Sequence, residues 1–540
     1  MARPGTGSAR PVTDARTLVL RDLLDAAVAE DVAGLASASL GPGPEGRPGT
    51  WVRHRLADGG CIAWCARPGG VVQRTRYADG PVLVGPVSVG TALREVTDPA
   101  EVVALLAPGA PHLDAVARDL TTAVEHTVLD PGASGEERAA ARGRPFHPTA
   151  RAVGGWTRAD LDRWGPGCRV PLDWVAVRSD HLRHGRSALG VGEAPEAPQA
   201  PEGYEALPVH PFDREHVLPA AFARELAEGV VVPLARGVGA GVATASLRTL
   251  DLGDGRHLKL PLGVTTLGSA RLLGARSLDH GQRGEQVLRR VLAADPDLAA
   301  RVAVADETSW SGFAAPDGGD EFHDRPGHLA AALRRLPPPA GTRRVPLGAL
   351  AWGGASAELF GSVVEAVVGA GIGFLRHGVL PEMHGQNVLL DLSGERVARV
   401  VLRDHDAVRV HPRWLSVPDP AYRLSPGGTQ SLRLDTPGAL IGFFATLALE
   451  VGLGGVVDAQ VRATGRPEAH WWAGIRRAVE DAVDATRTPV VRSTLQAVLL
   501  DAETWPYRSV LRPLLERGPS RGTSMPAGVV RVPNPLRAVR

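Results

Sequence analysis

The alternation of apolar and polar residues in the first part of the chain predicts a helix, then strands, then further helix. Apolar side chains recur at helical spacing between residues 16 and 36, which is typical of an amphipathic helix. They are Leu20, Leu23, Leu24, Ala27 and Val28. Short apolar runs broken by Gly and Pro from residue 51 to residue 89 favour strands and turns, and helical spacing returns from residue 101 to residue 129.

Two Pro-rich stretches divide the middle of the chain. Residues 193–203 are rich in Pro, Ala and Glu, and residues 315–344 contain three consecutive prolines. Both compositions are typical of exposed loops or linkers. The second break is the preferred domain boundary, and the segment between the two breaks has the pattern of several strands.

Beyond Pro346 the pattern predicts more helix than strand. Residues 357–370 have the pattern of a long apolar helix, and two strands are expected at 388–392 and 397–402. The remainder is mostly helical, and no internal repeat is visible, which excludes a solenoid. Together these elements predict an α+β fold.

The composition indicates a soluble globular protein. The 540 residues are 44% hydrophobic and 22% charged, and the formal net charge is +1. This balance lacks the basic excess of a nucleic-acid binder. The longest apolar stretch, residues 439–449, ends at Glu450 and is far shorter than a membrane span. We therefore expect neither nucleic acid nor a membrane as a partner.

The cysteines and the N-terminus favour a cytoplasmic location. Cys61, Cys65 and Cys168 are too few for a disulfide scaffold, and an odd number suits a reducing compartment. Residues 1–14 lack the charged start and apolar core of a signal peptide. Cys61 and Cys65 are interpreted as buried small apolar residues, with a weak metal pair as the alternative.

The basic residues are 59 arginines and one lysine, Lys259. A chain that uses arginine wherever a positive charge is enough retains lysine where a guanidinium cannot replace an ammonium, because the two groups differ in shape and hydration. Lys259 is therefore a candidate functional residue. The alternative is a chance remnant on a solvated face.

The first polar cluster is Gly-Arg-Pro-Phe-His-Pro at residues 143–148. Pro145 and Pro148 restrict the backbone on both sides of His147, so this imidazole is held at a fixed angle. The alternative is a Pro-rich turn whose histidine has only structural partners.

The second cluster follows the Gly-rich residues 237–241 and contains Ser246, Arg248 and Thr249. Small residues, hydroxyl groups and an arginine in one short stretch suit a polyanion, because they combine close backbone approach, neutral donors and a forked cation. The sequence contains no Walker motif, so phosphate binding here is not that of a P-loop.

The third cluster consists of Lys259 and Arg271, which lie twelve residues apart. Lys259 alternates with apolar residues in His-Leu-Lys-Leu, as expected for one face of a strand. One sheet face is then predicted to carry Arg248, Lys259 and Arg271. Three cations without matching carboxylates repel one another unless an anion joins them, whereas a plain solvated strand face is the alternative.

The fourth cluster is Pro-Glu-Met-His-Gly-Gln-Asn at residues 381–387, directly before one predicted strand, and Arg403-Asp404 directly after the next. This order places Asn387 and Asp404 at the same end of a hairpin. An amide oxygen and a carboxylate hold magnesium and nucleotide phosphates in kinase-like folds. A purely structural hairpin does not need so many polar groups in one turn.

In this order and spacing, the four clusters resemble the IucA/IucC family of NRPS-independent siderophore synthetases. The resemblance spans residues 140–410, and the closing Val-Pro-Asn-Pro-Leu at 532–536 resembles the family's C-terminal ending. Family members activate citrate or a related carboxylic acid with ATP as an acyl adenylate. An amine or hydroxylamine then attacks the adenylate and forms an amide or ester.

The resemblance implies a three-domain cradle with a kinase-like mixed α/β C-terminal region and a helical C-terminus. Its expected parts are a thumb-like domain at 1–138, a fingers-like domain at 139–345 that holds the ATP phosphates, and a palm-like domain at 346–540. The expected cofactors are ATP and Mg²⁺. The expected partners are a citrate-like acid and a polyamine, amino acid or hydroxylamine, and a homodimer is considered as the assembly.

The resemblance also implies roles for individual residues. The expected catalytic residues are Lys259, Arg271 and His384, of which Arg271 and His384 face the substrate carboxylates. The expected nucleotide-binding residues are His147, Ser246, Arg248, Thr249, Lys259, Gln386, Asn387 and Asp404. The expected magnesium ligands are Glu382, Asn387 and Asp404.

Three positions depart from the family pattern. The first His of the His-Pro-x-His-Pro segment is Arg144 here, the usual lysine after it is Arg151, and a family arginine is Val153. These departures concern the contacts of that loop and the choice of acid. The stretch 208–212, which matches another family segment, is expected to be structural.

Two other functions compete with a synthetase. A kinase-like phosphotransferase needs a catalytic aspartate between the His and the Asn of this motif, and Gln386 and Asn387 follow Gly385 directly. A non-enzymatic binder of ferric siderophore, or a reductase-like partner, is the second alternative. An iron–sulfur reductase would need C-terminal cysteines, and no cysteine follows Cys168.

Overall fold

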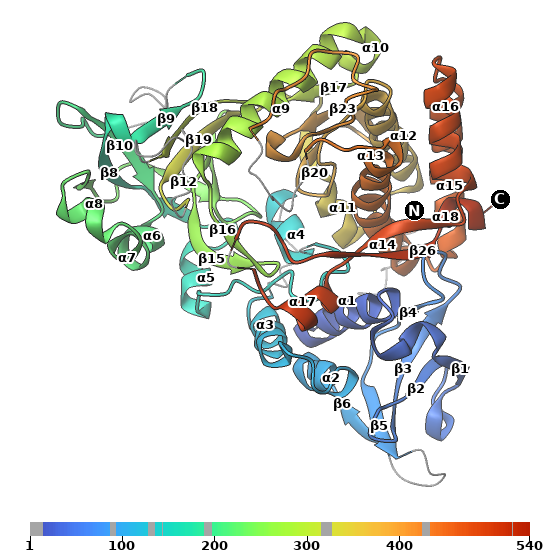
Figure 1. Ribbon diagram of the computed structural model, residues 1–540. Coiled ribbons are helices and arrows are strands. Elements are labelled where there is room, and N and C mark those ends of the chain that lie inside the picture. Colours follow the sequence, from blue (N-terminus) through green and yellow to red (C-terminus); the bar gives the residue numbers. More distant parts are fainter. Residues whose placement is uncertain are drawn as a thin grey trace, which may run out of the picture.

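The computed structural model describes residues 14–86, 93–127, 135–142, 144–187, 197–314, 327–423, 432–520 and 522–539. Runs of strands and runs of helices follow one another in these residues, which confirms the α+β prediction. Figure 1 shows an N-terminal region in blue, a strand-rich middle region in green, and a C-terminal region in which helices surround a small sheet. The C-terminal hairpin runs back across the molecule toward the N-terminal helix.

The N-terminal region consists of one buried helix against an antiparallel sheet. Helix α1 (Ala15–Ala29) begins at Asp14, whose carboxylate accepts a hydrogen bond from the backbone N–H of Thr17 at 3.0 Å. Its apolar residues form a core with the sheet. The helix is buried on all sides from residue 18 to residue 28, so the prediction of an amphipathic helix was wrong, and it ends at residue 29, before the expected residue 36. The other elements are β1 (Ser39–Pro42), β2 (Thr50–Arg55), β3 (Gly60–Pro68), β4 (Thr75–Tyr77), β5 (Val82–Pro86), β6 (Arg94–Val96), α2 (Pro99–Leu106) and α3 (Leu113–Glu125).

The cysteines of β3 are half-buried rather than buried. Cys61 and Cys65 lie four residues apart on this strand, and both are free thiols. Within the described residues, no cluster of three His, Cys, Asp or Glu side chains could hold a metal ion. The interpretation of the pair as a metal site is therefore not supported.

The middle region is built on a seven-stranded sheet in the order β7-β12-β13-β14-β19-β18-β9. A smaller sheet, β10-β8-β11, and the hairpin β15-β16 complete this region. The strands are β7 (Arg169–Pro171), β8 (Asp173–Arg178), β9 (Leu182–His184), β10 (Tyr204–Val209), β11 (Val231–Ala235), β12 (Ala240–Ala243), β13 (Thr249–Gly253), β14 (Arg256–Lys259), β15 (Leu262–Thr266), β16 (Ser269–Arg271), β18 (Asp306–Phe313) and β19 (Ala330–Arg335).

Strand β19 lies inside the second expected break, so the prediction of a continuous loop there was wrong. Its three consecutive alanines are buried between β14 and β18, because small side chains allow neighbouring layers to pack closely. The run of prolines follows this strand. Residues 193–196 of the first expected break and 315–326 of the second lie outside the described residues.

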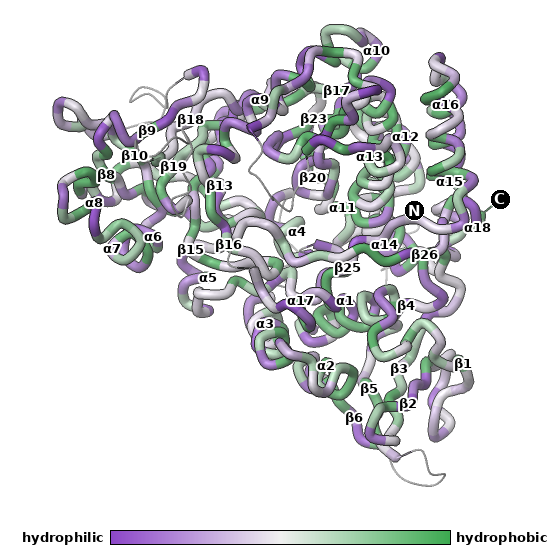
Figure 2. The backbone as a smooth tube through the Cα atoms, viewed as in Figure 1, coloured by the Kyte–Doolittle hydropathy of each residue, from purple (hydrophilic) through white to green (hydrophobic). Residues whose placement is uncertain are grey.

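The C-terminal region packs long apolar helices against a four-stranded sheet in the order β17-β23-β22-β20. Both expected strands are present as the antiparallel hairpin of β22 (Val388–Ser393) and β23 (Arg396–Leu402). The expected apolar helix is α12 (Ala357–Leu375). Figure 2 shows apolar segments concentrated around α12 and α13 in this region. The remaining strands of the sheet are β17 (Val302–Val304) and β20 (Arg343–Pro346).

The expected apolar stretch at 439–449 belongs to a longer helix. Helix α13 (Pro437–Phe444), the π-helical segment η5 (Ala445–Leu453) and α14 (Gly454–Thr464) are continuous over 28 residues. This helix and α12 are long and apolar enough to cross a membrane by composition alone, but both are largely buried inside the protein. Glu450, where the apolar stretch ends, is buried inside this helix, and burial raises its pKa well above the usual range.

Asp22 of α1 joins the N-terminal helix to the loop that precedes the middle region. Its carboxylate is fully buried and accepts hydrogen bonds from Arg142 at 3.0 Å and from Arg151 at 2.9 Å. It also accepts the backbone N–H of Phe146 at 3.3 Å. Burial acts to raise the pKa of Asp22, but the charges of Arg142 and Arg151 outweigh it and lower that pKa. The loop at 142–151 is thus held by one carboxylate.

A second carboxylate of the N-terminal region holds the C-terminal end of the chain. Glu30 accepts the backbone N–H groups of residues 510, 511 and 512 at 2.8, 3.0 and 2.7 Å. These N–H groups lie at the start of α17 (Leu511–Arg517), where they have no partners within the helix. The contact fixes α17 beside α1, as Figure 1 shows.

We predict that Asp22→Asn destabilises the protein by about 3–5 kcal/mol, because it leaves two buried guanidinium groups without their counter-charge. Urea unfolding followed by circular dichroism measures the change as a lower midpoint. The matched control is Asp180→Asn, which removes an exposed pair with Arg178 and should leave the midpoint unaltered. Equal midpoints for Asp22→Asn and the native protein would contradict this role of Asp22.

Candidate functional site

A pocket of about 670 Å³ lies where the middle and C-terminal regions meet. Its walls come from the loop after α4 (Gly135–Arg142), the segment before β13, the hairpin β15-β16, the loops that flank the β22-β23 hairpin, and η5. This volume is within the range of small-molecule sites. The pocket brings together segments that are more than 300 residues apart in the sequence.

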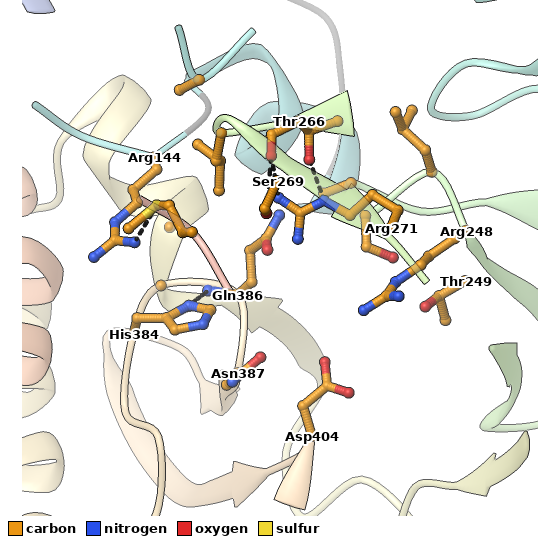
Figure 3. Close-up of a pocket in the computed structure, with 18 of the residues that line it drawn as sticks. Arg144, Arg248, Thr249, Thr266, Ser269, Arg271, His384, Gln386, Asn387 and Asp404 are labelled. Carbon is orange, nitrogen blue, oxygen red and sulfur yellow. Dashed lines mark hydrogen bonds between the residues drawn. The ribbon is translucent and has the colours of Figure 1, made fainter. Parts of the chain in front are cut away.

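Nearly all of the predicted site residues line this pocket. Figure 3 shows Arg248 and Thr249 on one side, Arg144 and His384 on the other, and Gln386 between them. The predicted residues in the lining are Ser246, Arg248, Thr249, Lys259, Arg271, Glu382, His384, Gln386, Asn387 and Asp404. His147 is the predicted residue that is not among them.

His147 lies behind the pocket wall and is 1% exposed. Phe146, directly before it, has a positive φ of 62°, and this left-handed conformation turns the chain between the two prolines. Burial, together with the charges of Arg144 and Arg271, holds the pKa of His147 well below its usual range. The expected contact between His147 and ATP is therefore not supported by its position, and Arg144 faces the pocket instead.

The segment before β13 presents hydroxyl groups and a cation to the pocket. Leu247 has a φ of 64°, and the backbone N–H of Arg248 donates to the carbonyl of Ser246 at 2.7 Å, which closes a tight turn. The guanidinium of Arg248 donates to the carbonyl of Leu272 at 2.6 Å. Thr249 is then paired in register with Lys259 across β13 and β14, so the two predicted clusters are adjacent.

Lys259 lies on β14 as predicted, but it has a carboxylate partner. Its ammonium lies 2.5 Å from Oδ1 of Asp404, and the residue is 7% exposed. Arg271 belongs to the separate hairpin β15-β16. The prediction of three unpaired cations on one sheet face was therefore wrong in both respects, although Arg248, Lys259 and Arg271 do face the same pocket.

Asp404 joins the middle region to the C-terminal hairpin through a buried network. Its Oδ1 also accepts from Arg334 at 2.5 Å, and its backbone N–H donates to Glu307 at 2.7 Å. Burial acts to raise the pKa of Asp404, but the charges of Arg334 and Lys259 outweigh it and hold that pKa well below its usual range. Asp404 is thus an anion in a left-handed turn with φ 62°.

Three residues of this network were missed by sequence reasoning. Glu307 and Arg334 lie on β18 and β19 and pair with each other at 2.5 Å, and nothing in the local sequence marks them. Asp406 lines the pocket 3.9 Å from the ammonium of Lys259. The Asp-His-Asp sequence at 404–406 is a signal that could have identified it.

Asn387 and Asp404 fit the requirements of a magnesium ion better than Glu382 does. The two side chains project from the same end of the β22-β23 hairpin toward the pocket, and both residues are part of its lining. Amide and carboxylate oxygens are ligands that Mg²⁺ accepts beside phosphate oxygens. Glu382 instead lies 3.6 Å from Arg409 and 3.8 Å from His384.

Arg271 and His384 also line the pocket, from the hairpin β15-β16 and from the loop before β22. Arg271 donates to the carbonyl of Thr266 at 2.9 Å, and burial together with Arg248 and Arg144 lowers the pKa of its guanidinium to about 9. Nδ1 of His384 accepts the backbone N–H of Gln386 at 3.2 Å. This bond leaves Nε2 as the protonated nitrogen of the neutral ring, pointing at Glu382.

The three departures from the family pattern have different structural consequences. Arg151 donates to Asp22 and to the carbonyls of Ala141 and Arg142, so its guanidinium stabilises the loop at 142–151. Val153 is buried, and its backbone N–H donates to His126. Only Arg144 of the three presents a free charge to the pocket.

The stretch at 208–212 is structural, as expected. Nδ1 of His210 accepts the backbone N–H of Phe212 at 3.2 Å at the start of α6 (Pro211–His216). His210 is 1% exposed, and burial lowers its pKa to about 3.

Two family models match the chain in succession. Residues 135–351 match the IucA / IucC family, and residues 356–521 match the model described as ferric iron reductase FhuF-like transporter. The boundary between the two matches falls at the start of α12, which opens the helical part of the C-terminal region.

One similar sequence spans almost the whole chain, and another spans half of it. Staphyloferrin B synthase of Staphylococcus aureus (strain NCTC 8325 / PS 47) is 31% identical over 97% of this chain and 98% of its own length. Rhizobactin siderophore biosynthesis protein RhbC of Rhizobium meliloti (strain 1021) is 27% identical over 50% of this chain and 53% of its own.

Solved structures share the fold at low identity. Petrobactin biosynthesis protein AsbB from Bacillus anthracis str. Sterne has a TM-score of 0.78 at 16% identity, over 97% of this chain and 95% of its own. ATP-bound aerobactin synthetase IucA from a hypervirulent pathotype of Klebsiella pneumoniae has a TM-score of 0.73 at 18% identity, over 96% and 99%.

We predict that His384 stays neutral down to mildly acidic pH. Burial lowers its pKa to about 4, and the charges of Arg144 and Arg508 act in the same direction, whereas Glu382 opposes them. NMR titration of the imidazole should give a midpoint near pH 4, and Arg508→Met should raise this midpoint. Arg492→Met, on an exposed position of α16 (Pro489–Leu495), should not move it. A midpoint near 6.5 in the native protein would contradict the assignment.

Proposed function

Because the chain belongs to the IucA/IucC family of siderophore synthetases, we propose that it adenylates a carboxylic acid with ATP and condenses it with an amine or hydroxylamine. The acid is citrate or a derivative of citrate or succinate, and the product is an amide or ester of siderophore biosynthesis. The protein is in this proposal an AMP- and pyrophosphate-forming acid–amine ligase. The observation that supports it is a single pocket lined by Arg248, Thr249 and Lys259 together with Arg271, His384, Asn387 and Asp404.

The first step is attack by a carboxylate oxygen on the α-phosphorus of ATP, with pyrophosphate as the leaving group. Both reactants are anions, so the site must balance their charge before orientation can accelerate the reaction. Arg248, Thr249 and Lys259 line the pocket and would bind the phosphate oxygens. Asn387 and Asp404 would hold Mg²⁺, which neutralises charge on the phosphates when bound.

Arg271 and His384, which line the same pocket, would hold the reacting carboxylate. A guanidinium matches the geometry of a carboxylate with two parallel hydrogen bonds. The neutral His384 ring offers an N–H donor without adding a charge that would compete with the phosphates. In the second step the amine nitrogen attacks the acyl carbon of the adenylate, AMP leaves with the C–O bond electrons, and the nitrogen loses a proton to give the amide; attack by an oxygen in the same way gives the ester.

A kinase-like phosphotransferase is disfavoured by the turn at 384–387. The residues between His384 and Asn387 are Gly385 and Gln386, so no carboxylate takes the position of a catalytic base. The carbonyl of Gly385 accepts the backbone N–H of Gly348 at 2.8 Å, so this position serves packing.

A reductase role is disfavoured despite the match of residues 356–521 to the FhuF-like model. Iron–sulfur clusters need cysteine thiolates, and the three cysteines of the chain all precede residue 169. The matched segment instead supplies the wall of the pocket through His384, Asn387 and Asp404. We place the reaction in the cytoplasm, where ATP is available.

The proposal predicts release of pyrophosphate and AMP in a screen of acids against amines. The purified protein with ATP and Mg²⁺ should release both products with citrate, a citrate amide or a succinylated hydroxamate when a suitable amine is present, and mass spectrometry identifies the condensed product. ADP as the product would favour the phosphotransferase. Release of neither AMP nor pyrophosphate with every acid and amine would refute the synthetase.

Lys259→Arg should retain the fold and lose most adenylation, by roughly 10²-fold, as for other removed transition-state contacts. Lys259 is buried and its point charge lies 2.5 Å from Asp404, so the longer planar guanidinium cannot occupy the same position. Acid-dependent exchange of ATP with labelled pyrophosphate measures the rate. Arg492→Lys, an exposed exchange of the same two cations, is the control. Adenylate formation at the native rate in Lys259→Arg would show that the lysine is an accident of composition.

A further inference from the structure

We propose that Ser416, His377 and Asp295 form a second catalytic site, which hydrolyses carboxylic esters with a small acyl group through an acyl-serine. Ser416 is the nucleophile, His377 is the general base, and Asp295 positions the base. The pocket described above is lined by none of these three residues. Figure 1 shows α10 (Pro296–Ala299), which follows Asp295 directly, at the upper edge of the molecule and away from the hairpin β15-β16 of that pocket. This inference is therefore independent of the proposed function.

The three side chains are connected by two hydrogen bonds. Nδ1 of His377 lies 2.7 Å from Oγ of Ser416, and Nε2 lies 3.2 Å from Oδ2 of Asp295. A nucleophile within hydrogen-bond reach of a base, with the base oriented by a third group, is the arrangement that activates a serine. The ring is reversed relative to the serine-protease arrangement, in which Nε2 faces the serine. Either nitrogen of a neutral imidazole can accept a proton, so the reversed ring can act as the base.

The carboxylate of Asp295 fixes which nitrogen of His377 carries the proton. Its Oδ1 accepts the backbone N–H of Leu298 at 3.0 Å, which leaves Oδ2 for the imidazole. Burial acts to raise the pKa of Asp295, but the hydrogen bonds from Leu298 and His377 outweigh it and lower that pKa. An ionised carboxylate only accepts hydrogen bonds, so Nε2 of His377 is the donor. Nδ1 then carries no proton and accepts the hydroxyl of Ser416.

The backbone holds Ser416 beside His377. The N–H of Ser416 donates to the carbonyl of His377 at 3.3 Å. The N–H of His411, at the start of the same loop, donates to the carbonyl of Gly378 at 2.9 Å. Gly378 has a φ of 71°, and a Cβ atom there would lie 2.5 Å from the carbonyl carbon of Trp414. Glycine permits this close approach, so the loop that carries Ser416 packs directly against the end of α12.

The hydroxyl group of Ser416 is accessible to a substrate. Ser416 is exposed, whereas the side chains of His377 and Asp295 are 18% and 21% exposed. The backbone N–H of Val417, directly after the nucleophile, donates to no acceptor among the residues that the structure describes. In α/β-hydrolases the N–H after the nucleophile is one donor of the oxyanion hole. The oxyanion that forms on attack by Ser416 therefore has a donor next to it.

The reaction consists of two balanced steps. Oγ of Ser416 attacks the carbonyl carbon of the ester, and its proton passes to Nδ1 of His377. The C–O bond to the alcohol then breaks, and Nδ1 returns the proton to the alcohol oxygen. Water attacks the acyl carbon as Nδ1 takes one of its protons, and the bond from the acyl carbon to Oγ breaks as Oγ regains a proton. Asp295 stays ionised throughout and stabilises the imidazolium.

The open position of the site selects the class of substrate. Ser416 lies on an exposed loop, so few contacts hold the rest of the substrate, and little binding energy is available to assist the chemical step. The leaving group must therefore depart readily by itself. Esters with an acidic alcohol meet this condition, and amides do not.

Two other serines serve as internal controls. Nδ1 of His184 lies 2.9 Å from Oγ of Ser311, and Nε2 lies 3.3 Å from Glu205. Ser311 has a base and a carboxylate in the same order, but it is 2% exposed on β18 and does not meet a substrate. Ser493 is exposed on α16, and its hydroxyl donates to a backbone carbonyl at 3.1 Å. Of these three serines, Ser416 alone combines exposure with a base.

The test combines ester hydrolysis with covalent labelling of the full-length protein. The probes are p-nitrophenyl acetate and diisopropyl fluorophosphate, which attaches its phosphoryl group to an activated serine as fluoride leaves. We expect mass spectrometry to find both modifications on Ser416 and on neither Ser311 nor Ser493. Ser416→Ala should remove the label and most of the hydrolysis, and His377→Gln should lower the rate of hydrolysis by roughly 10²-fold or more.

Asp295→Asn tests the positioning role. Asparagine still caps the start of a helix, but its amide can donate to Nε2 of His377 and force the proton onto Nδ1. Hydrolysis should then fall by roughly 10²- to 10⁴-fold, as when the wrong tautomer is imposed on a serine triad. Nitrogen-15 NMR of the imidazole should show the proton on Nε2 in the native protein and on Nδ1 in the variant.

The outcomes decide the proposal without reference to the synthetase reaction. Hydrolysis at the native rate in Ser416→Ala would show that an imidazole alone hydrolyses the ester, and it overturns the site. Labelling of Ser311 or Ser493 in place of Ser416, or no labelling of any serine, overturns it as well. Thermal unfolding of Ser416→Ala should match that of the native protein, because the side chain is exposed.

Discussion

The ion pair between Lys259 and Asp404 is the contact on which the site depends. Lys259 lies at the end of a strand in the middle region, and Asp404 follows a strand of the C-terminal region. Arg334 and Glu307 extend this pair into a buried network in which each charge has a partner. Buried charges are tolerated only under this condition. The two sides of the pocket are therefore brought together by a neutralised network, and the unpaired cations remain on the surfaces that face a ligand.

The arginines of the pocket wall divide into two groups by their partners. Arg142 and Arg151 are held by Asp22 and shape the loop that precedes the middle region. Arg144, between them in the sequence, has no such partner and faces the cavity. The Asp22 carboxylate on α1 thus binds two of the three arginines between residues 142 and 151, which become structural. It leaves Arg144 available to substrate. This division arises from tertiary contacts, because the three arginines occur in one local sequence.

Much of the site could be predicted from the sequence because its motifs are local. The hairpin of β22 and β23 follows directly from two short apolar runs, and it places Asn387 and Asp404 as expected. The polar face of β14 placed Lys259 correctly. These predictions succeeded because a strand's period and a hairpin's register fix the direction of side chains over a few residues.

The remaining features depend on contacts between distant segments. The carboxylate partner of Lys259 lies 145 residues away in the sequence. Strand β19 was not predicted, because its run of alanines shows no alternation of polar and apolar residues. His147 and Arg144 differ by three positions, yet the left-handed turn at Phe146 buries one and exposes the other to the pocket. Arg508 lies in a hairpin without any motif. Such features are set by packing and buried charge, which a local pattern does not record.

The contact of Glu30 with residues 510–512 has a consequence for biosynthesis of the chain. The carboxylate is made about 480 positions before its three N–H partners. A buried carboxylate without partners is costly, so Glu30 stays in contact with water during translation until residues 510–512 have been made. The N-terminal region therefore reaches its final position against α17 late in the synthesis of this chain.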